Sequence, residues 1–318
     1  MTITTPALRP GSALTNVVAP VLARPEAAAA AVFAAIRRRG PVARDVIASV
    51  SGLSIATVNR QVSALLDAQL VRERADLAVP GAIGRPRVPV ELNHEPFLTL
   101  GVHVGARTTS IVASDLFGRT LDAVETPTAS GSQAAGLASL ADSVRRYRSR
   151  WHRRRALWVG VALGGVGDSH TGQVDHPRLG WSAAPLGPVL ARALGLPVSV
   201  ASHVDAMAGA ELLLGGQPQR DGTSSLYLYA RETVGFAQVI DGRVHTPVGG
   251  PGTIAGLPVS SEMLGGSGQL ESTVSDEAVL AAHRKIGIVP TSGPNSTLAA
   301  LLQVARSEDG QASDAREL

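Results

Sequence analysis

The chain has 318 residues, enough for two domains, and 44% of them are hydrophobic, which is a normal globular share. It contains no cysteine, and this excludes disulfides, thiolate zinc sites and cysteine nucleophiles. The net charge is only +3, but residues 1–92 carry 11 arginines against 6 acidic residues. Such an asymmetry is typical of a segment that binds a polyanion.

The first residues carry no membrane or secretion signal. No apolar run in the chain approaches the roughly 20 residues that span a bilayer. Residues 1–20 also lack a basic start followed by a continuous apolar stretch. We therefore expect a cytoplasmic protein with no membrane partner. Because Pro6, Pro10, Gly11 and Pro20 interrupt the segment, residues 1–24 are predicted to form a disordered tail.

Three helical patterns follow, over residues 26–39, 43–50 and 55–68. A tight break at Ser51-Gly52-Leu53 separates the last two, and Ser54 is well placed as the N-cap of the third helix. Apolar residues at helical spacing are expected to face the neighbouring helices. They are Val46, Ile47 and Val50 in the second pattern and Ile55, Val58, Val62, Leu65 and Leu66 in the third.

Two helices joined by a short turn with glycine are typical of a helix-turn-helix, whose second helix enters the major groove of DNA. Small and polar residues on the third helix can approach base edges, since arginine suits guanine and glutamine suits adenine. An ordinary three-helix bundle with a solvated polar face is the alternative interpretation. The predicted DNA-binding residues are Ser54, Ala56, Thr57, Asn59, Arg60 and Gln61.

A wing is predicted after the third helix. Residues 69–74 and 89–92 have the pattern of two paired strands, and the Gly- and Pro-rich loop 80–87 connects them. The loop presents Arg85 and Arg87 on a stiff backbone, where arginine can follow phosphates or enter a narrow minor groove. An ordinary hairpin loop is the alternative.

Most of the chain resembles the ROK family (repressor, open reading frame, kinase). The resemblance covers roughly residues 25–280. Its motifs include Gly40-Pro41-Val42-Ala43-Arg44, Ser51-Gly52-Leu53-Ser54-Ile55-Ala56-Thr57-Val58, Gly84-Arg85-Pro86, Leu100-Gly101-Val102-His103-Val104-Gly105, Asp115-Leu116-Phe117-Gly118, Leu179-Gly180-Trp181, Asp241-Gly242-Arg243 and Gly256-Leu257-Pro258-Val259. It implies an α/β fold in which an N-terminal winged helix-turn-helix precedes a sugar-kinase-like domain of the actin and hexokinase type.

The second domain also has an α/β pattern by itself, because apolar strands alternate with helical stretches. We place the winged helix-turn-helix at residues 25–93, the kinase-like domain at 94–303 and a polar tail at 304–318. Relatives continue further, so the domain is expected to be C-terminally shortened. Either the lineage is truncated or a partner completes the lobe.

The residues that the resemblance implies for phosphate transfer are missing. The first phosphate loop, normally Asp-x-Gly-Gly-Thr, is His103-Val104-Gly105-Ala106-Arg107, and the second, normally rich in glycine, is Arg231-Glu232-Thr233-Val234-Gly235. Ser202 and His203 occupy the place of the catalytic Asn-Asp pair. The zinc cysteines are replaced by Glu262, Leu264 and Gln269, so neither zinc nor another cofactor is expected. The sequence predicts that the protein is not an enzyme.

The sugar pocket is altered as well. At positions that the resemblance assigns to sugar-binding residues the chain has Arg178, Ser202, His203 and Thr253. This candidate pocket is expected to be vestigial, or to take an anionic sugar derivative with help from His176. A basic cluster between Arg145 and Arg155, interleaved with Tyr147 and Trp151, is interpreted as a solvated surface, with nucleic-acid contact as the alternative.

Together these features predict a sequence-specific DNA-binding transcription regulator, a repressor or an activator, that binds a palindromic operator in double-stranded DNA as a homodimer. Two alternatives remain. One is a regulator that senses a sugar or an anionic sugar derivative, and the other is a residual sugar kinase.

Overall fold

The structure is a computed structural model, and it describes residues 16–78, 88–215, 224–231, 233–247, 252–261, 266–285 and 306. The chain divides into two compact units. The first contains residues 1–203 and 213–216, and the second contains 204–212 and 217–318. Within the described ranges no helix is long and apolar enough to cross a membrane.

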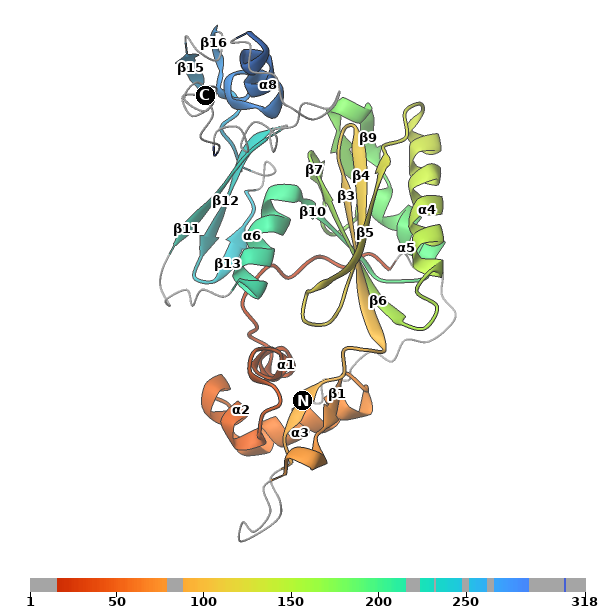
Figure 1. Cartoon of the computed structure of the whole chain (residues 1–318), viewed down its shortest axis with the longest axis vertical. Coiled ribbons are helices and arrows are strands. Elements are labelled where there is room, and N and C mark those ends of the chain that lie inside the picture. The colour runs from red at the N-terminus through yellow and green to blue at the C-terminus, as the bar shows by residue number, and fades with distance from the viewer. Residues whose placement is uncertain are drawn as a thin grey trace. The chain divides into compact units, whose positions relative to one another are not determined.

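Three short helices and a hairpin open the first unit (Figure 1). The helices are α1 (Ala28–Arg39), α2 (Arg44–Ser51) and α3 (Ile55–Asp67), and the antiparallel strands are β1 (Val71–Glu73) and β2 (Val90–Leu92), with a 3-10 turn η1 (Ala75–Leu77). These bounds confirm the predicted helices to within two residues at each end. Their shared core consists of Val32, Ala35, Ile36, Val42, Ile47, Val58, Val62, Leu65, Val71, Val90 and Leu92.

The segment before α1 corrects the prediction of a disordered tail. Residues 1–15 lie outside the described ranges, but residues 16–18 pair in parallel with the strand that begins at Val198. The Val18 N–H donates to the Val198 carbonyl at 2.9 Å, and the Val198 N–H donates to the Asn16 carbonyl at 2.9 Å. An edge strand offers a free row of backbone donors and acceptors, and this segment uses it.

A five-stranded sheet forms the centre of the first unit, in the order β10-β6-β3-β4-β5. Its strands are β3 (Phe97–Val104), β4 (Thr108–Ser114), β5 (Thr120–Pro127), β6 (Arg155–Leu163) and β10 (Val198–Ser202). Strands β3, β6 and β10 run parallel to one another, whereas β4 and β5 pair antiparallel. Parallel neighbours need crossover connections, which contain the helices α4 (Gln133–Ser149) and α5 (Leu186–Leu194).

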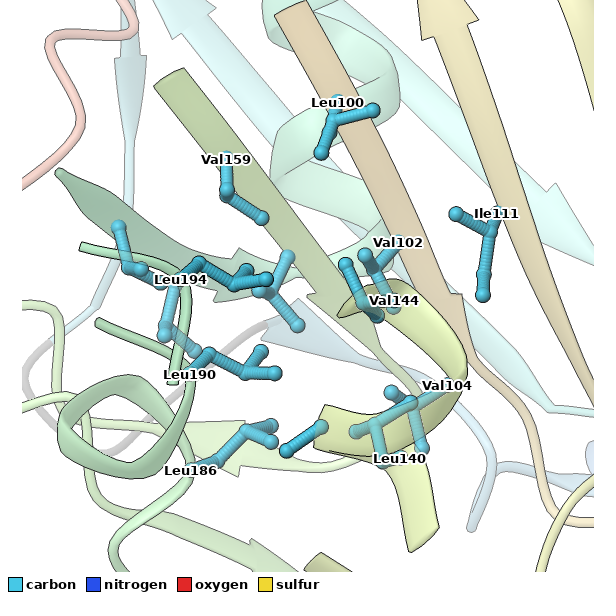
Figure 2. Close-up of a cluster of buried hydrophobic side chains, with 14 of the residues drawn as sticks. Leu100, Val102, Val104, Ile111, Leu140, Val144, Val159, Leu186, Leu190 and Leu194 are labelled. Atoms are coloured by element: carbon cyan, nitrogen blue, oxygen red, sulfur yellow. The ribbon is translucent and has the colours of Figure 1, made fainter. Parts of the chain in front are cut away.

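The core lies between this sheet and those two helices, as Figure 2 shows. In β3 the even-numbered residues Leu98, Leu100, Val102 and Val104 are buried in that core, while His103 between them is half-buried. Alternation along a strand places successive side chains on opposite faces. His103 therefore points to the face of the sheet away from α4 and α5.

A small antiparallel sheet follows β6, made of β7 (Val166–Gly167), β8 (Val174–His176) and β9 (Trp181–Ala184), with a 3-10 turn η2 (Pro177–Leu179) between the last two. Helix α6 (His203–Leu214) begins directly after β10. Strands β3, β6 and β10 all end at the same edge of the large sheet. The small sheet follows β6 at this edge, and helix α6 follows β10 there.

The second unit is built on an antiparallel sheet of β11 (Ser225–Ala230), β12 (Val234–Ile240), β13 (Arg243–His245) and β14 (Gly252–Thr253). Asp241 and Gly242 both have positive φ, as the tight hairpin between β12 and β13 requires. The hairpin of β15 (Pro258–Ser261) and β16 (Gly266–Gln269) and the helices α7 (Leu270–Val274) and α8 (Asp276–Lys285) follow. The predicted polar tail lies outside the described ranges, apart from residue 306.

Candidate nucleic-acid interface and imidazole cluster

The turn between α2 and α3 has the geometry that its sequence predicts. Gly52 ends α2 in the left-handed region, with φ 68° and ψ 11°, which glycine adopts without steric cost. Ser54 then caps α3, because its Oγ accepts a hydrogen bond from the Thr57 N–H at 3.2 Å. The two helices are therefore joined by a short and locally determined turn.

The outer face of α3 is polar and open to solvent. Ser54, Ala56, Asn59 and Arg60 are exposed, while Thr57 and Gln61 are half-buried. Ala56, Asn59 and Arg60 are three and four residues apart, so they share one side of the helix. All six residues predicted to bind DNA on this helix therefore reach solvent at least in part.

Arg60 differs from Arg44, Arg72 and Arg74, the arginines near it in this part of the chain. Arg44 pairs with Glu73 at 2.8 Å, and Arg72 and Arg74 each pair with Glu91 at 2.8 Å. Among the residues that the structure describes, no hydrogen bond or ion pair engages the Arg60 side chain. Its guanidinium is free to bind an external group.

The apolar face of α3 is shorter than its spacing indicates. Val58, Val62 and Leu65 are buried as predicted, but Ile55 is 50% exposed. Ile55 is the first residue of α3, and spacing defines a face without defining how far the neighbouring helices extend along it. Sequence reasoning therefore missed Ile55 as an exposed apolar residue beside the polar positions.

Helix α2 shows the same limit of the spacing argument. Val46 and Val50 are each 39% exposed, although they were expected to pack inside with Ile47, which is buried. The predicted wing arginines, Arg85 and Arg87, lie outside the described residues, so only the strands that flank their loop are placed.

Three histidines gather where the parallel strands of the large sheet end. Val104 of β3 and Ser202 of β10 are both in register with Leu163, the last residue of β6. The rings of His103 and His203 have centroids 5.8 Å apart. A Cβ on Gly164 would lie 3.4 Å from His203 Cε1 and 4.0 Å from His176 Nε2. We call His103, His176 and His203 the imidazole cluster.

Burial keeps two members of the imidazole cluster neutral. It lowers the pKa of His203 to about 4, with contributions from His103 and His176. It also lowers the pKa of His176, and the nearby charge of Arg178 contributes in the same direction. A neutral imidazole of low pKa is a weak base at pH 7. Neither ring adds positive charge for an anionic ligand.

The remaining predicted pocket residues belong to both units. Ser202 is buried and precedes His203 directly, and Arg178 is exposed on η2. Thr253 belongs to the second unit, where its hydroxyl donates to the Val234 carbonyl at 3.1 Å and accepts from the Ala255 N–H at 3.1 Å. The structure therefore places Ser202 and His203 next to each other in the first unit and Thr253 in the second.

Other positions of the predicted phosphate and zinc sites are used structurally. The Arg231 guanidinium pairs with Asp276 at 3.1 Å. The Gln269 carbonyl accepts from the Ser272 and Thr273 hydroxyls at the start of α7. Glu232, Glu262 and Leu264 lie outside the described residues. In the part of the chain that is described, no three His, Asp or Glu side chains form a group that could hold a metal ion.

Comparison with known proteins gives matches over most of the chain. The sequence model of the ROK family matches residues 99–318. A transcriptional regulator of Mycobacterium tuberculosis is 68% identical over 306 residues, which cover 94% of this chain and 70% of that protein.

Solved structures share the fold. A ROK family transcriptional regulator, described as a homologue of the E. coli MLC protein, superposes with a TM-score of 0.70 at 23% identity over 96% of this chain and 77% of its own. A ROK family glucokinase from Streptomyces griseus in complex with glucose and AMPPNP gives a TM-score of 0.56 at 20% identity, over 69% of this chain and 74% of that one.

Proposed function

The chain belongs to the ROK family, and we propose that it is a transcription regulator that binds double-stranded DNA through a winged helix-turn-helix at residues 25–93. The observation that carries the proposal is the polar, solvent-facing start of α3, where the Arg60 guanidinium is unengaged within the described part of the chain. The name of the 68% identical relative, a transcriptional regulator, supports it.

In this proposal α3 is the recognition helix and lies in the major groove. Arg60 and Gln61 read guanine and adenine edges, and Ser54, Ala56, Thr57 and Asn59 complete the contact surface. Ile55 is added to this set, because an exposed apolar side chain at the start of the helix suits the methyl group of thymine.

The wing contributes affinity rather than base reading. Arg85 and Arg87 contact the phosphate backbone or the minor groove. A homodimer places two copies of α3 on inverted half-sites, one or two helical turns apart. The operator is therefore palindromic.

Selection of bound DNA from a random library tests the proposal. We expect the full chain to enrich one palindromic motif and Arg60→Ala to relax the preference at one position of each half-site. Loss of a bidentate arginine–guanine contact reduces discrimination by about 1–3 kcal/mol. Arg146→Ala, which removes an exposed arginine on α4, is the charge-matched control and should keep the motif. Equal motifs from wild type and Arg60→Ala would contradict the assignment of α3.

The kinase-like domain, residues 94–303, regulates or assembles the protein without transferring phosphate. Two observations support this: Ser202 and His203 stand in place of the catalytic Asn-Asp pair, and the ion pair with Asp276 engages Arg231, the first residue of the second phosphate loop. A coupled ATP-consumption assay with a panel of hexoses tests it. Turnover that His203→Asn abolishes would establish a residual kinase instead.

A metabolite-sensing regulator is the second candidate. The imidazole cluster favours it, because three imidazole rings gather at the strand ends, and imidazole is a side chain that can hydrogen-bond sugar hydroxyls. Ligand binding to the native state raises the unfolding temperature, so thermal shift with sugars and sugar phosphates measures it. A shift that His203→Asn removes would support sensing, and no shift with any of them would leave a ligand-free regulator.

A further inference from the structure

A basic cavity lies at the opposite end of the large sheet from the imidazole cluster, where β6 and β10 begin. Its volume is about 720 Å³. The end of α4, the turn that follows it and the stretch 195–197 line it together with Asn16. We call this space the arginine cavity, and its charged and aromatic lining residues are Arg145, Arg148, Trp151, His152, Arg154 and Arg155.

The charge of the arginine cavity is one-sided. Among the described residues that line it there are four arginines and no aspartate or glutamate. Arg145 pairs with Asp142 outside the lining at 2.7 Å, so the excess positive charge comes mainly from the other three arginines. Like charges that converge on a concave surface with apolar walls raise the local positive potential. The walls here include Ala156 and Leu196, both buried. An anion would relieve this repulsion, whereas a neutral sugar would not.

Two of the guanidiniums are held in place by the fold. Arg148 donates to the Leu194 carbonyl at the end of α5, and Arg154 donates to the carbonyls of His94 and Phe97 at 3.2 and 3.3 Å. Arginine has five donors, so these bonds leave further N–H groups for a ligand. Donors fixed before binding cost less entropy when the ligand arrives.

We propose that the arginine cavity is a binding site for a small, multiply charged anion of the phosphate or pyrophosphate class. Its volume falls within the range of about 300–1,000 Å³ that is usual for small-molecule sites. Arginine suits phosphate because its planar fork can donate two parallel hydrogen bonds. A concavity with two half-buried arginines, Arg148 and Arg154, favours a compact anion over a DNA backbone, which would follow an open surface.

The site borders both connections between the large sheet and the three-helix segment. Asn16 at its rim is bonded through its carbonyl to the Val198 N–H, at the start of the segment that leads to α1. Arg154 holds the link between β2 and β3. A consequence that rests on the proposed function is that the bound anion changes operator affinity.

Titration calorimetry of the full chain with inorganic pyrophosphate, at constant ionic strength, tests the site. Arg145 and Arg155 are exposed, so the double variant R145Q/R155Q is expected to fold, and circular dichroism checks this. Its matched control is R146Q/R153Q, which removes two exposed arginines that do not line the cavity. We expect saturable binding by wild type and by the control, and affinity at least about tenfold weaker in R145Q/R155Q, a loss of about 1.4 kcal/mol.

Three results would overturn the proposal. They are no saturable binding to wild type, equal affinities in the two double variants, and a loss in His203→Asn as large as that in R145Q/R155Q. Fluorescence anisotropy with labelled operator DNA tests whether these arginines bind the phosphates of DNA instead of a small anion. If R145Q/R155Q weakens DNA binding while wild type ignores pyrophosphate, the arginines contact DNA. If wild type binds pyrophosphate but no DNA, the site stands and the proposed function fails.

Discussion

The turn between α2 and α3 gives the sharpest test of the local geometry. Gly52 has φ 68°, and a Cβ added there would meet no atom within 4 Å. Gly52→Ala therefore costs backbone strain alone, about 1–2 kcal/mol for a left-handed residue. Loss of unfolded-state freedom returns about 0.4–1 kcal/mol. The net loss of local stability should be about 1 kcal/mol.

Hydrogen exchange of the amides in α2 and α3 measures this loss, because it reports the free energy of local opening. A change of about 1 kcal/mol lowers protection by about fivefold. Gly52→Asn is the matched control, since asparagine enters the left-handed region more readily than alanine. Equal protection in Gly52→Ala and wild type would refute the left-handed turn. Equal losses of protection in Gly52→Ala and Gly52→Asn would mean that the added side chain, and not the left-handed φ, causes the effect.

Three further outcomes follow from single contacts. Ser54→Ala removes the cap on the Thr57 N–H and should lower the unfolding free energy by about 0.5–2 kcal/mol in a denaturant titration, while Ser54→Asp should keep most of it. Since the pKa of His203 is lowered to about 4, the unfolded state takes up its proton first. Stability is therefore complete above the ordinary histidine pKa and falls as pH drops from about 6.5 towards 4, and His203→Gln should flatten that part of the unfolding profile. Ser199→Ala removes the hydrogen bond to the Val18 carbonyl, 2.7 Å long, and should speed amide exchange over residues 17–24; unchanged exchange would mean that the backbone pairing suffices.

Local patterns predict most of the N-terminal segment. Helix spacing, the capping Ser54 and the left-handed Gly52 are properties of a few consecutive residues, and all three are present in the structure. The same reasoning placed Ile55 inside, because periodicity says nothing of where a neighbouring helix ends. The alternation of strands and helices around the large sheet was also predictable from the sequence. In β3 every second residue from Leu98 to Val104 is buried.

Contacts between distant parts of the chain could not be predicted from the sequence. The arginines before β6 were visible as a charge run, but the cavity needs residues 195–197 and Asn16 beside them. The pairing of residues 16–18 with β10 joins segments about 180 positions apart, and nothing in either strand's own pattern specifies its partner. The imidazole cluster likewise depends on the register of three strand ends.

Strand β10 connects the imidazole cluster with the segment that leads to α1. It ends at Ser202, directly before His203 of the imidazole cluster, and it begins at Val198, which bonds the segment leading to α1. Ser199, one residue further, bonds both the Val18 carbonyl and the Trp158 Nε1. Because the Ser199 hydroxyl adds a side-chain bond to the backbone pairing of residues 16–18, Ser199→Ala should loosen the segment that leads to α1 without removing a residue of the imidazole cluster or of the arginine cavity.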